Sequence, residues 1–281
     1  MAYIKVIAIG DVVGEPGLLS LERELPGLIR NNGADFTMVN GENAAAGFGM
    51  TQESFRRILH AGADVVTSGN HVWEKKDFWP FLDSEERLLR PGNYPGKSPG
   101  RGWVLIQKAG LAWLVINLQG REYMSALDCP FRAFDEIIAA GGKAAAALAP
   151  DTAEAAGIPA PVVLVDFHAE SAREKEALGY YLDGRAAMVV GTHTHVQTAD
   201  ERVLPKGTGY ITDLGMTGVQ DAVIGMDTKI CLDRARTQIL YRMEVAKMPE
   251  SSDCGVRGLI AELDPQTGRA VSVKRIPWQD D

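Results

Sequence analysis

Short apolar runs alternate with longer amphipathic stretches through the first two-thirds of the chain. This pattern predicts an α/β fold in which helices pack over a sheet. Runs typical of strands lie at residues 3–9, 36–39, 65–66, 162–167 and 188–190. Residues 103–107 and 113–118 flank the turn sequence Lys-Ala-Gly, which predicts a hairpin.

Helical stretches separate several of these strands. Residues 17–31 predict a helix that ends near Gly33, a residue type that is common just past a helix end. Thr51 fits the N-cap of a second helix, and Phe55 and Ile58 fall on the apolar face behind it. We therefore expect helices on the connections between the first strands.

The C-terminal part of the chain has a different pattern. Apolar runs around residues 239–245, 256–263 and 270–276 predict mostly strands, as a sheet edge or as a second sheet that completes a sandwich. No repeat or linker marks a domain boundary, and 46% hydrophobic with 23% charged residues is typical of globular proteins. We therefore expect a single domain over residues 1–281.

Charge limits the classes of partner. The chain carries 29 Lys and Arg against 37 Asp and Glu, a net charge of −8 at pH 7. A protein of this charge repels duplex nucleic acid and acidic membranes, so an anionic substrate needs a local positive field. No window approaches the roughly 18 uninterrupted apolar residues of a membrane helix. The N-terminal run also lacks the features of a secretory signal peptide.

Cysteine usage favours a reducing compartment. Cys129, Cys231 and Cys254 lie far apart and form no C-x-x-C pair. This spacing argues against a disulfide framework and against a thiolate zinc site. We expect a cytoplasmic protein, and the sequence leaves open whether it forms a homo-oligomer.

Polar side chains follow five of the predicted strands. Carboxylate, amide and imidazole groups recur there, at Asp11, Glu42, Asn43, Asn70, His71, His168, His193 and His195. In open α/β sheets the carboxyl ends of the strands face the ligand crevice, so we expect these residues to converge in space. Four of the five histidines lie at such ends, which scattered placement would seldom produce.

Each of these residues, taken alone, also has a structural interpretation. Asp11 fits a helix cap, and a lone histidine at a strand end is usually structural. The pair His193 and His195 weakens that interpretation, because residues two apart on an extended segment project to the same side. His60 lies in the last turn of a predicted helix and is interpreted as structural. For Asp213, near a Gly-rich segment, the pattern favours a turn.

The candidate ligands are oxygen and nitrogen atoms without sulfur, a set that suits Mn, Fe or Zn. They are too numerous for one ion. Two ions about 3.5–4 Å apart, bridged by a carboxylate and a hydroxide, would use them and would serve phosphoryl chemistry. Two divalent ions outweigh the charges of Asp11 and Glu42, which would provide the positive field that an anionic substrate needs.

The strand-end motifs resemble those of the calcineurin-like metallophosphoesterase superfamily. GNH at residues 69–71 matches one block of that superfamily, and GTHTH at residues 191–195 matches its G-H-x-H block with one inserted residue. GDVVG at residues 10–14 lacks the usual histidine, and NGENAA at residues 40–45 replaces the usual acidic block. Both departures are similar to the bacterial YmdB-like subfamily. Further similar stretches are RPGNYP, INLQGR, DFHAE, DGRA and ITDLGMTG, so the resemblance covers nearly the whole chain.

The resemblance implies a four-layer α/β/β/α sandwich of two mixed β-sheets flanked by helices. It implies that one carboxylate bridges two metal ions and that each ion has three further ligands: Glu42 as the bridge, Asp11, Asn43 and His195 on one ion, and Asn70, His168 and His193 on the other. His71 would be the general acid. The subfamily is associated with hydrolysis of cyclic nucleotides, particularly 2′,3′-cyclic ones.

The expected reaction is therefore in-line attack of a metal-bridging hydroxide on a cyclic nucleotide, 2′,3′-cyclic or 3′,5′-cyclic, with Fe or Mn as the metals and Zn also compatible. A phosphomonoesterase or nucleotidase would use the same site, and a regulatory metal-binding module with little turnover stays open. An oxidoreductase with a nucleotide cofactor is disfavoured, because GDVVG lacks the G-x-G-x-x-G spacing.

Overall fold

The computed structural model describes residues 2–148, 161–248 and 254–276. Its first sheet has five strands in the order β14-β13-β1-β3-β4, namely Ala270–Ile276, Gly258–Leu263, Ile4–Ile9, Phe36–Asn40 and Val65–Thr67. β1, β3 and β4 run parallel, whereas β13 is antiparallel to both β1 and β14. The last two strands of the chain therefore form a sheet edge, as their sequence pattern predicts.

The second sheet has six strands in the order β5-β6-β7-β8-β10-β9, namely Trp103–Lys108, Leu111–Gln119, Val162–His168, Met188–Thr192, Gly209–Ile211 and Arg202–Val203. β5 and β6 form the predicted hairpin, and β6, β7, β8 and β10 run parallel. A small third sheet, which the sequence pattern does not predict, joins β12 (Cys254–Gly255), β11 (Met216–Val219) and β2 (Asp11–Val12).

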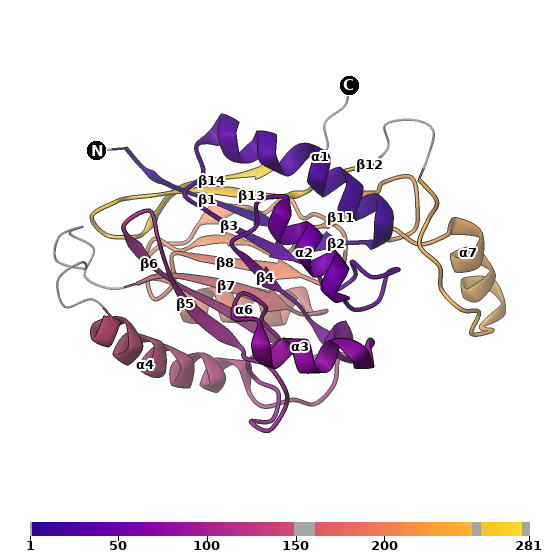
Figure 1. Cartoon of the computed structure of the whole chain (residues 1–281), viewed down its shortest axis with the longest axis horizontal. Helices are drawn as coiled ribbons and strands as arrows, with labels where there is room; N and C mark the ends of the chain where they lie inside the picture. Colours follow the sequence, from indigo (N-terminus) through magenta and orange to yellow (C-terminus); the bar gives the residue numbers. More distant parts are fainter. Residues whose placement is uncertain (1, 149–160, 249–253, 277–281) are drawn as a thin grey trace.

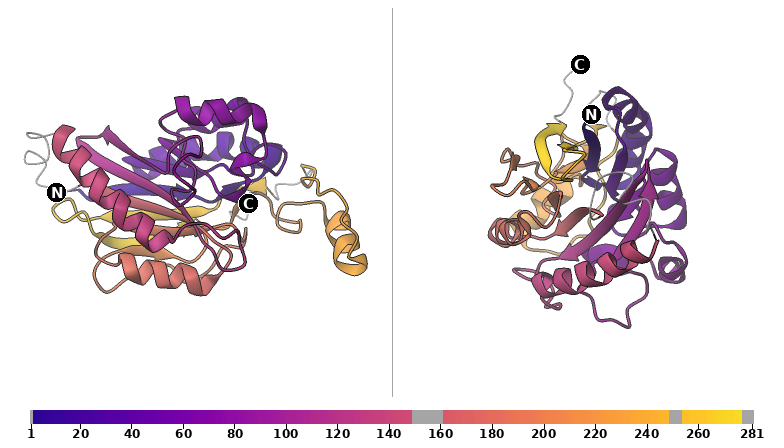
Figure 2. Two further views of the ribbon diagram at one scale, coloured as in Figure 1. Left: turned by 90° about the horizontal axis from the view of Figure 1, so that it is seen from below. Right: turned by 90° about the vertical axis from the view of Figure 1, so that its left-hand side faces the viewer.

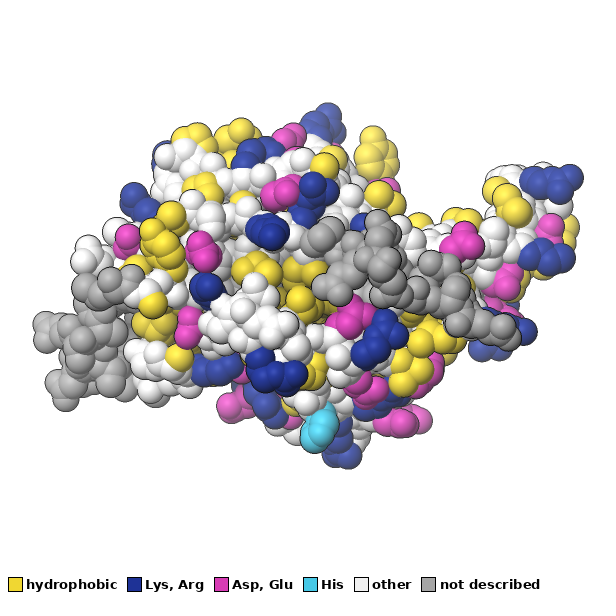
Figure 3. All heavy atoms as spheres, turned by 90° about the horizontal axis from the view of Figure 1, so that it is seen from above, with side chains coloured by type: hydrophobic (Ala, Val, Ile, Leu, Met, Phe, Trp, Pro, Cys, Tyr) yellow, Lys and Arg dark blue, Asp and Glu magenta, His cyan; other side chains and the backbone are white. Residues whose placement is uncertain are grey.

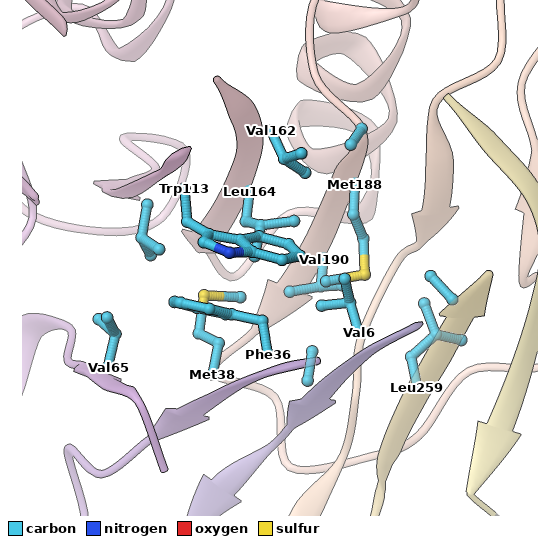
Figure 4. Packing of buried hydrophobic residues seen from close by; sticks show 14 of the residues in the cluster. Val6, Phe36, Met38, Val65, Trp113, Val162, Leu164, Met188, Val190 and Leu259 are labelled. Carbon is cyan, nitrogen blue, oxygen red and sulfur yellow. The ribbon is translucent and has the colours of Figure 1, made fainter. Parts of the chain in front are cut away.

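The two large sheets pack face to face through one apolar core. Successive side chains of a strand point to opposite faces, so Val6 of β1 enters this core while its neighbour Ile7 faces the other side. The rings of Phe36 and Trp113 stack between the sheets with centroids 4.6 Å apart. Figure 4 shows these rings together with Val190 of β8, which approaches Val6 from the second sheet.

Helices cover the two outer faces. They are α1 (Gly14–Asn32), α2 (Gln52–His60) and α3 (Trp79–Ser84) on the first sheet, and α4 (Pro130–Leu148) and α6 (Ala172–Leu182) on the second. Leu21 and Phe55 pack with Ile7 on one side, and Phe134 and Leu178 pack on the other. In Figure 1 α1 lies above the strands and α4 below them, and Figure 2 shows the same layers from two further sides. The fold is the predicted four-layer α/β/β/α sandwich.

The helix ends follow the sequence signals. Gly33 adopts a left-handed conformation, with φ 63°, at the end of α1, and its N–H donates to Arg30 O. Thr51 and Ser54 form a reciprocal capping box at the start of α2. Among the described helices, none combines the length and the apolar character that a bilayer-spanning segment requires.

Residues 239–245 do not form the predicted strand. They follow α7 (Thr228–Thr237), which has no buried residue, and Leu240 is 84% exposed. In the described part of the chain, the strand-type pairing of this run is limited to an isolated bridge between Met226 and Val245. Figure 3 shows the α7 end projecting from the body with hydrophobic and basic side chains at its surface. The prediction is wrong because an apolar run becomes a strand only where a neighbouring strand pairs with its backbone.

Candidate metal centre

The eight polar residues from the predicted strand ends come from both large sheets. Asp11 opens β2 directly after β1, Glu42 and Asn43 follow β3, Asn70 and His71 lie in the short 3-10 helix η1 (Asn70–Trp73) after β4, His168 ends β7, and His193 and His195 follow β8. The carboxyl ends of these parallel strands lie at one edge of the sandwich. Contacts join the two sheets there, since His168 approaches Glu42 and His193 approaches Asp11.

Glu42, His168 and His193 form a group of potential metal ligands whose ligand atoms lie within 4.8 Å of one another. His168 Nε2 lies 3.0 Å from Glu42 Oε1, 3.0 Å from His193 Nδ1 and 3.1 Å from Asn70 Oδ1. A histidine Nε2 carries at most one proton, so it can donate a hydrogen bond to only one of these three atoms at a time. The carboxylate and amide oxygens are acceptors and carry no proton to donate in return. The four side chains thus direct acceptor atoms at one point, which fits a cation.

Two buried oxygen atoms at this edge accept no hydrogen bond: Asp11 Oδ1 and Asn43 Oδ1. Asn43 Nδ2 donates to Gly47 O at 3.0 Å, and Asp11 Oδ2 already accepts from the His193 N–H at 3.2 Å. Leaving a buried acceptor unsatisfied costs about 1–3 kcal/mol, and such atoms call for an ion or another partner. The oxygens of Asp11 and Asn43 therefore also fit a metal.

His193 and His195 do not lie on an extended segment, so the reason given for their shared side is wrong. The strand β8 ends at Thr192, and both histidines beyond it have a left-handed backbone, with φ 101° at His193 and 66° at His195. His195 Nδ1 lies 2.9 Å from Ile224 O. His195 stays outside the group of three ligands, although it is close enough for its charge to lower the pKa of Asp11.

Charges inside the group shift its pKa values strongly. Burial lowers the pKa of His168, but the surrounding carboxylates, Glu42 before Asp11 and Asp166, together outweigh burial and raise it to about 9. Burial raises the pKa of Glu42, but the surrounding histidines, His168 foremost, together outweigh burial and lower it to about 2. Burial and the charge of His168 lower the pKa of His193 to about 3. Burial raises the pKa of Asp11 to about 6. A proton on His168 thus offsets carboxylate charge where a cation would otherwise do so.

Polar residues that the sequence interpretation missed orient His168. The Thr192 hydroxyl donates to Asp166 Oδ1 at 2.7 Å and lies 2.9 Å from His168 Nδ1. Because the hydroxyl proton goes to Asp166, its oxygen accepts from Nδ1–H, which directs Nε2 at Glu42. Thr67 and Asn40 also donate to Asp166. Asp166 lies two positions before His168, so the alternation of β7 was the signal that could have identified it.

A glycine leaves the space in front of this group open. A Cβ atom at Gly69 would overlap both Glu42 Oε2 and the ring of His168, including Nε2. The side chains that meet here therefore need a residue without a side chain at this position. The gap lies where an ion would contact both of them.

Gly69→Ala is expected to weaken Mn²⁺ binding at least about tenfold, because the added methyl group forces Glu42 and the His168 ring apart. Isothermal titration calorimetry on the metal-free protein measures this change, and thermal unfolding reports any effect on the fold. Gly96→Ala is the matched control, since a Cβ there meets no atom within 4 Å. Equal affinities of the two variants would contradict a metal site at Gly69.

Comparison with known proteins identifies the family of this chain. The family model described as YmdB-like protein matches residues 7–276. The chain is 43% identical over 278 residues to the 2′,3′-cyclic-nucleotide 2′-phosphodiesterase of Bacillus subtilis (strain 168). The alignment covers 99% of this chain and 98% of that protein. These matches extend over both sheets and over every candidate ligand.

Solved structures with the same fold support the relationship. The crystal structure of a hypothetical protein from Thermus thermophilus is 38% identical with a TM-score of 0.85, covering 99% of this chain and 100% of that one. The crystal structure of a phosphatase from Mycoplasma pneumoniae is 29% identical with a TM-score of 0.85, covering 98% of this chain and 94% of that one. Matched by the family model and by relatives over nearly its whole length, the chain belongs to the YmdB-like family, as its strand-end motifs predict.

Proposed function

We propose that this protein is a dimetal-dependent phosphodiesterase that hydrolyses cyclic nucleotides, with 2′,3′-cyclic nucleotides preferred over 3′,5′-cyclic AMP. The observation that carries the proposal is the pair of buried oxygens without hydrogen-bond partners at Asp11 and Asn43, next to the group of Glu42, His168 and His193, whose ligand atoms lie within 4.8 Å of one another. The name of the Bacillus subtilis relative supports the choice of substrate. Small nucleotide diesters, rather than duplex nucleic acid, suit the net charge of −8.

The ligand assignment follows the family motif, and separate observations support parts of it. Glu42 would be shared by the two ions; Asp11, Asn43 and His195 would hold one, and Asn70, His168 and His193 would hold the other. For the second set, the mutual distances of 3.0–3.1 Å between ligand atoms support the assignment. For the first set, the unpartnered oxygens of Asp11 and Asn43 support it. Oxygen and imidazole donors favour Fe or Mn and are compatible with Zn.

When bound, the two ions lower the pKa of water to supply the nucleophile and offset charge on the phosphate. The protein holds the phosphate at the carboxyl edge of both sheets, where the buried carboxylates of Asp11 and Glu42 leave the ions a net positive charge. His71 lies next to the proposed ligand Asn70 and outside the group of three potential ligands, with its Nδ1 3.2 Å from Glu74 Oε1. We assign His71 as the acid that gives a proton to the leaving ribose oxygen.

A reducing cytoplasm is the proposed compartment. Cys129, Cys231 and Cys254 are all unpaired, and Cys254 is buried beside Ser20. Free thiols at separate places in the fold are typical of proteins in a reducing environment. This agrees with a nucleotide substrate of intracellular origin.

The experiment compares turnover of 2′,3′-cyclic AMP, 3′,5′-cyclic AMP and a simple phosphomonoester by the protein loaded with Mn²⁺ or Fe²⁺. We expect turnover of the 2′,3′-cyclic diester to dominate and to disappear when a chelator removes the metal, since the ions supply the nucleophile. Addition of Mn²⁺ should restore it. Preference for the monoester would identify a phosphatase or nucleotidase instead. Metal binding without turnover of any of the three would identify a regulatory module.

A further inference from the structure

A buried ion pair lies directly behind the histidines of the candidate metal centre. Lys175 Nζ lies 2.7 Å from Asp213 Oδ2, and each residue is 1% exposed. Lys175 is in the first turn of α6, which follows β7, and Asp213 follows β10. A buried ion pair adds little stability compared with apolar residues of the same size. The groups that the pair holds in place therefore explain its presence better than stability does.

Asp213 binds the residue that separates His193 from His195. Its Oδ2 accepts from the Thr194 N–H at 3.1 Å and from the Thr194 hydroxyl at 2.8 Å. Its Oδ1 accepts from the Gly215 N–H at 2.8 Å, which is the turn contact that the sequence predicts. With Lys175, Oδ2 receives three hydrogen bonds. A charged carboxylate accepts this number of donors far better than a neutral amide does.

The segment that Asp213 holds has a strained backbone. His193 and His195, on either side of Thr194, both have positive φ, a region that residues with side chains enter at an energetic cost. Such a conformation persists only where surrounding contacts determine it. The bonds from Asp213 to both the N–H and the hydroxyl of Thr194 provide such contacts at the centre of the segment.

Lys175 supplies the charge that keeps this arrangement stable. The His193 backbone N–H donates to Asp11 Oδ2 at 3.2 Å and the Thr194 backbone N–H donates to Asp213 Oδ2 at 3.1 Å, so two carboxylates lie against neighbouring amides of the histidine segment. The ammonium group of Lys175 offsets the second of them. Through α6 it also connects the segment to the strand that ends in His168. One ion pair thus joins the elements after β7, β8 and β10.

We propose that Lys175 and Asp213 are positioning residues that lock the segment from His193 to His195 into the conformation that binds metal. Neither residue touches the substrate. The proposal rests on the proposed function in that it needs a metal centre at His193. It adds that the affinity of this centre depends on an ion pair outside the ligand set.

The test uses the double variant Lys175→Met with Asp213→Asn. Removing one partner alone would leave a buried unpaired charge, whereas removing both keeps the volume with no net charge change. The amide offers one acceptor and can serve Thr194 or Gly215 but not both. We expect a melting temperature close to that of the wild type, faster hydrogen exchange at the Thr194 amide in the metal-free protein, and about 10–100-fold weaker Mn²⁺ binding by calorimetry.

A more exposed pair of the same two residue types, at the opposite end of the sheets, provides the control. Lys108 Nζ lies 2.6 Å from Asp64 Oδ2, beside the hairpin turn. Lys108→Met with Asp64→Asn should leave both Mn²⁺ affinity and exchange at Thr194 unchanged. Thr194→Val, which deletes one hydroxyl and keeps both charges, is the second test variant and should weaken Mn²⁺ binding in the same direction.

The outcomes separate this inference from the proposed function. If the wild type binds no Mn²⁺, the proposed function fails. Hydrogen exchange at the Thr194 amide still tests, without metal, whether the ion pair fixes the conformation of the segment from His193 to His195. If the wild type binds Mn²⁺, and both the double variant and Thr194→Val bind it with the affinity of the wild type, the positioning role of Lys175 and Asp213 is overturned. A loss of affinity in the control pair of the same size as in the double variant would overturn it as well.

Discussion

Replacing His71 with Ala lowers kcat for 2′,3′-cyclic AMP by an expected 10²–10⁴-fold, roughly the contribution of a general acid, while metal binding is retained. His71 lies beside the centre without entering the ligand group. Its backbone N–H donates to Glu42 Oε2 at 3.2 Å, and its ring packs in a T-shaped arrangement with the ring of Phe48, with centroids 5.0 Å apart. A ribose alkoxide leaves poorly without a proton. Steady-state kinetics together with metal analysis of the same sample measures both quantities.

A diester with a nitrophenolate leaving group isolates proton donation, because that group leaves without help. On this substrate the loss in His71→Ala should shrink to less than about tenfold. His60→Ala serves as the control, since His60 is an exposed residue in the last turn of α2. Equal losses on both diesters would show that His71 does not act as the acid.

The second large effect is expected for Glu42→Gln, which should lose both metals and at least about 10³-fold in kcat/KM. Glu42 is 1% exposed, and its carboxylate reaches His168 with one oxygen and the His71 N–H with the other. The surrounding histidines, His168 foremost, keep the pKa of Glu42 at about 2 despite burial, so the substitution removes a full negative charge at neutral pH. The amide also places N–H donors where a cation would lie.

Metal content after gel filtration, measured on Glu42→Gln and on the wild type, checks this expectation. Glu53→Gln removes a carboxylate of the same kind from the exposed surface of α2 and should keep wild-type metal content and activity. Stoichiometric metal in Glu42→Gln would exclude the bridging position and would leave Glu42 as a structural partner of His168.

The layers of helices and sheets could be predicted because the residues that each element buries recur at regular intervals along the chain. The apolar run before His168 is a strand buried over its whole length, and the hairpin around residues 108–110 has its turn where Gly110 permits a positive φ. Local signals also located Gly33 and Thr51 at helix ends. The run at residues 239–245 has the same apolar content but no sheet beside it in the described structure, so composition alone misled.

The candidate site could be predicted only in part, because local patterns along the sequence do not show contacts between distant residues. Strand-end position and motif spacing pointed to Glu42, His168 and His193, since a polar group at a buried strand end is rare and conspicuous. Asp166 and Lys175 were missed, because one lies within an apolar strand and the other within a helix where lysine is common. Their role depends on distant partners: Asn40 lies 126 positions from Asp166, and Asp213 lies 38 positions from Lys175.

The α/β class, most of the strands, the end of the sheets at which polar groups collect, and the family could all be predicted from the amino-acid sequence. Those features depend on local periodicity and on motifs that a single stretch of chain carries. The left-handed backbone at His193 and His195, the gap at Gly69 and the ion pair of Lys175 with Asp213 could be identified only in the folded chain. These depend on close approaches between distant segments, whose energies arise only once both sheets have packed.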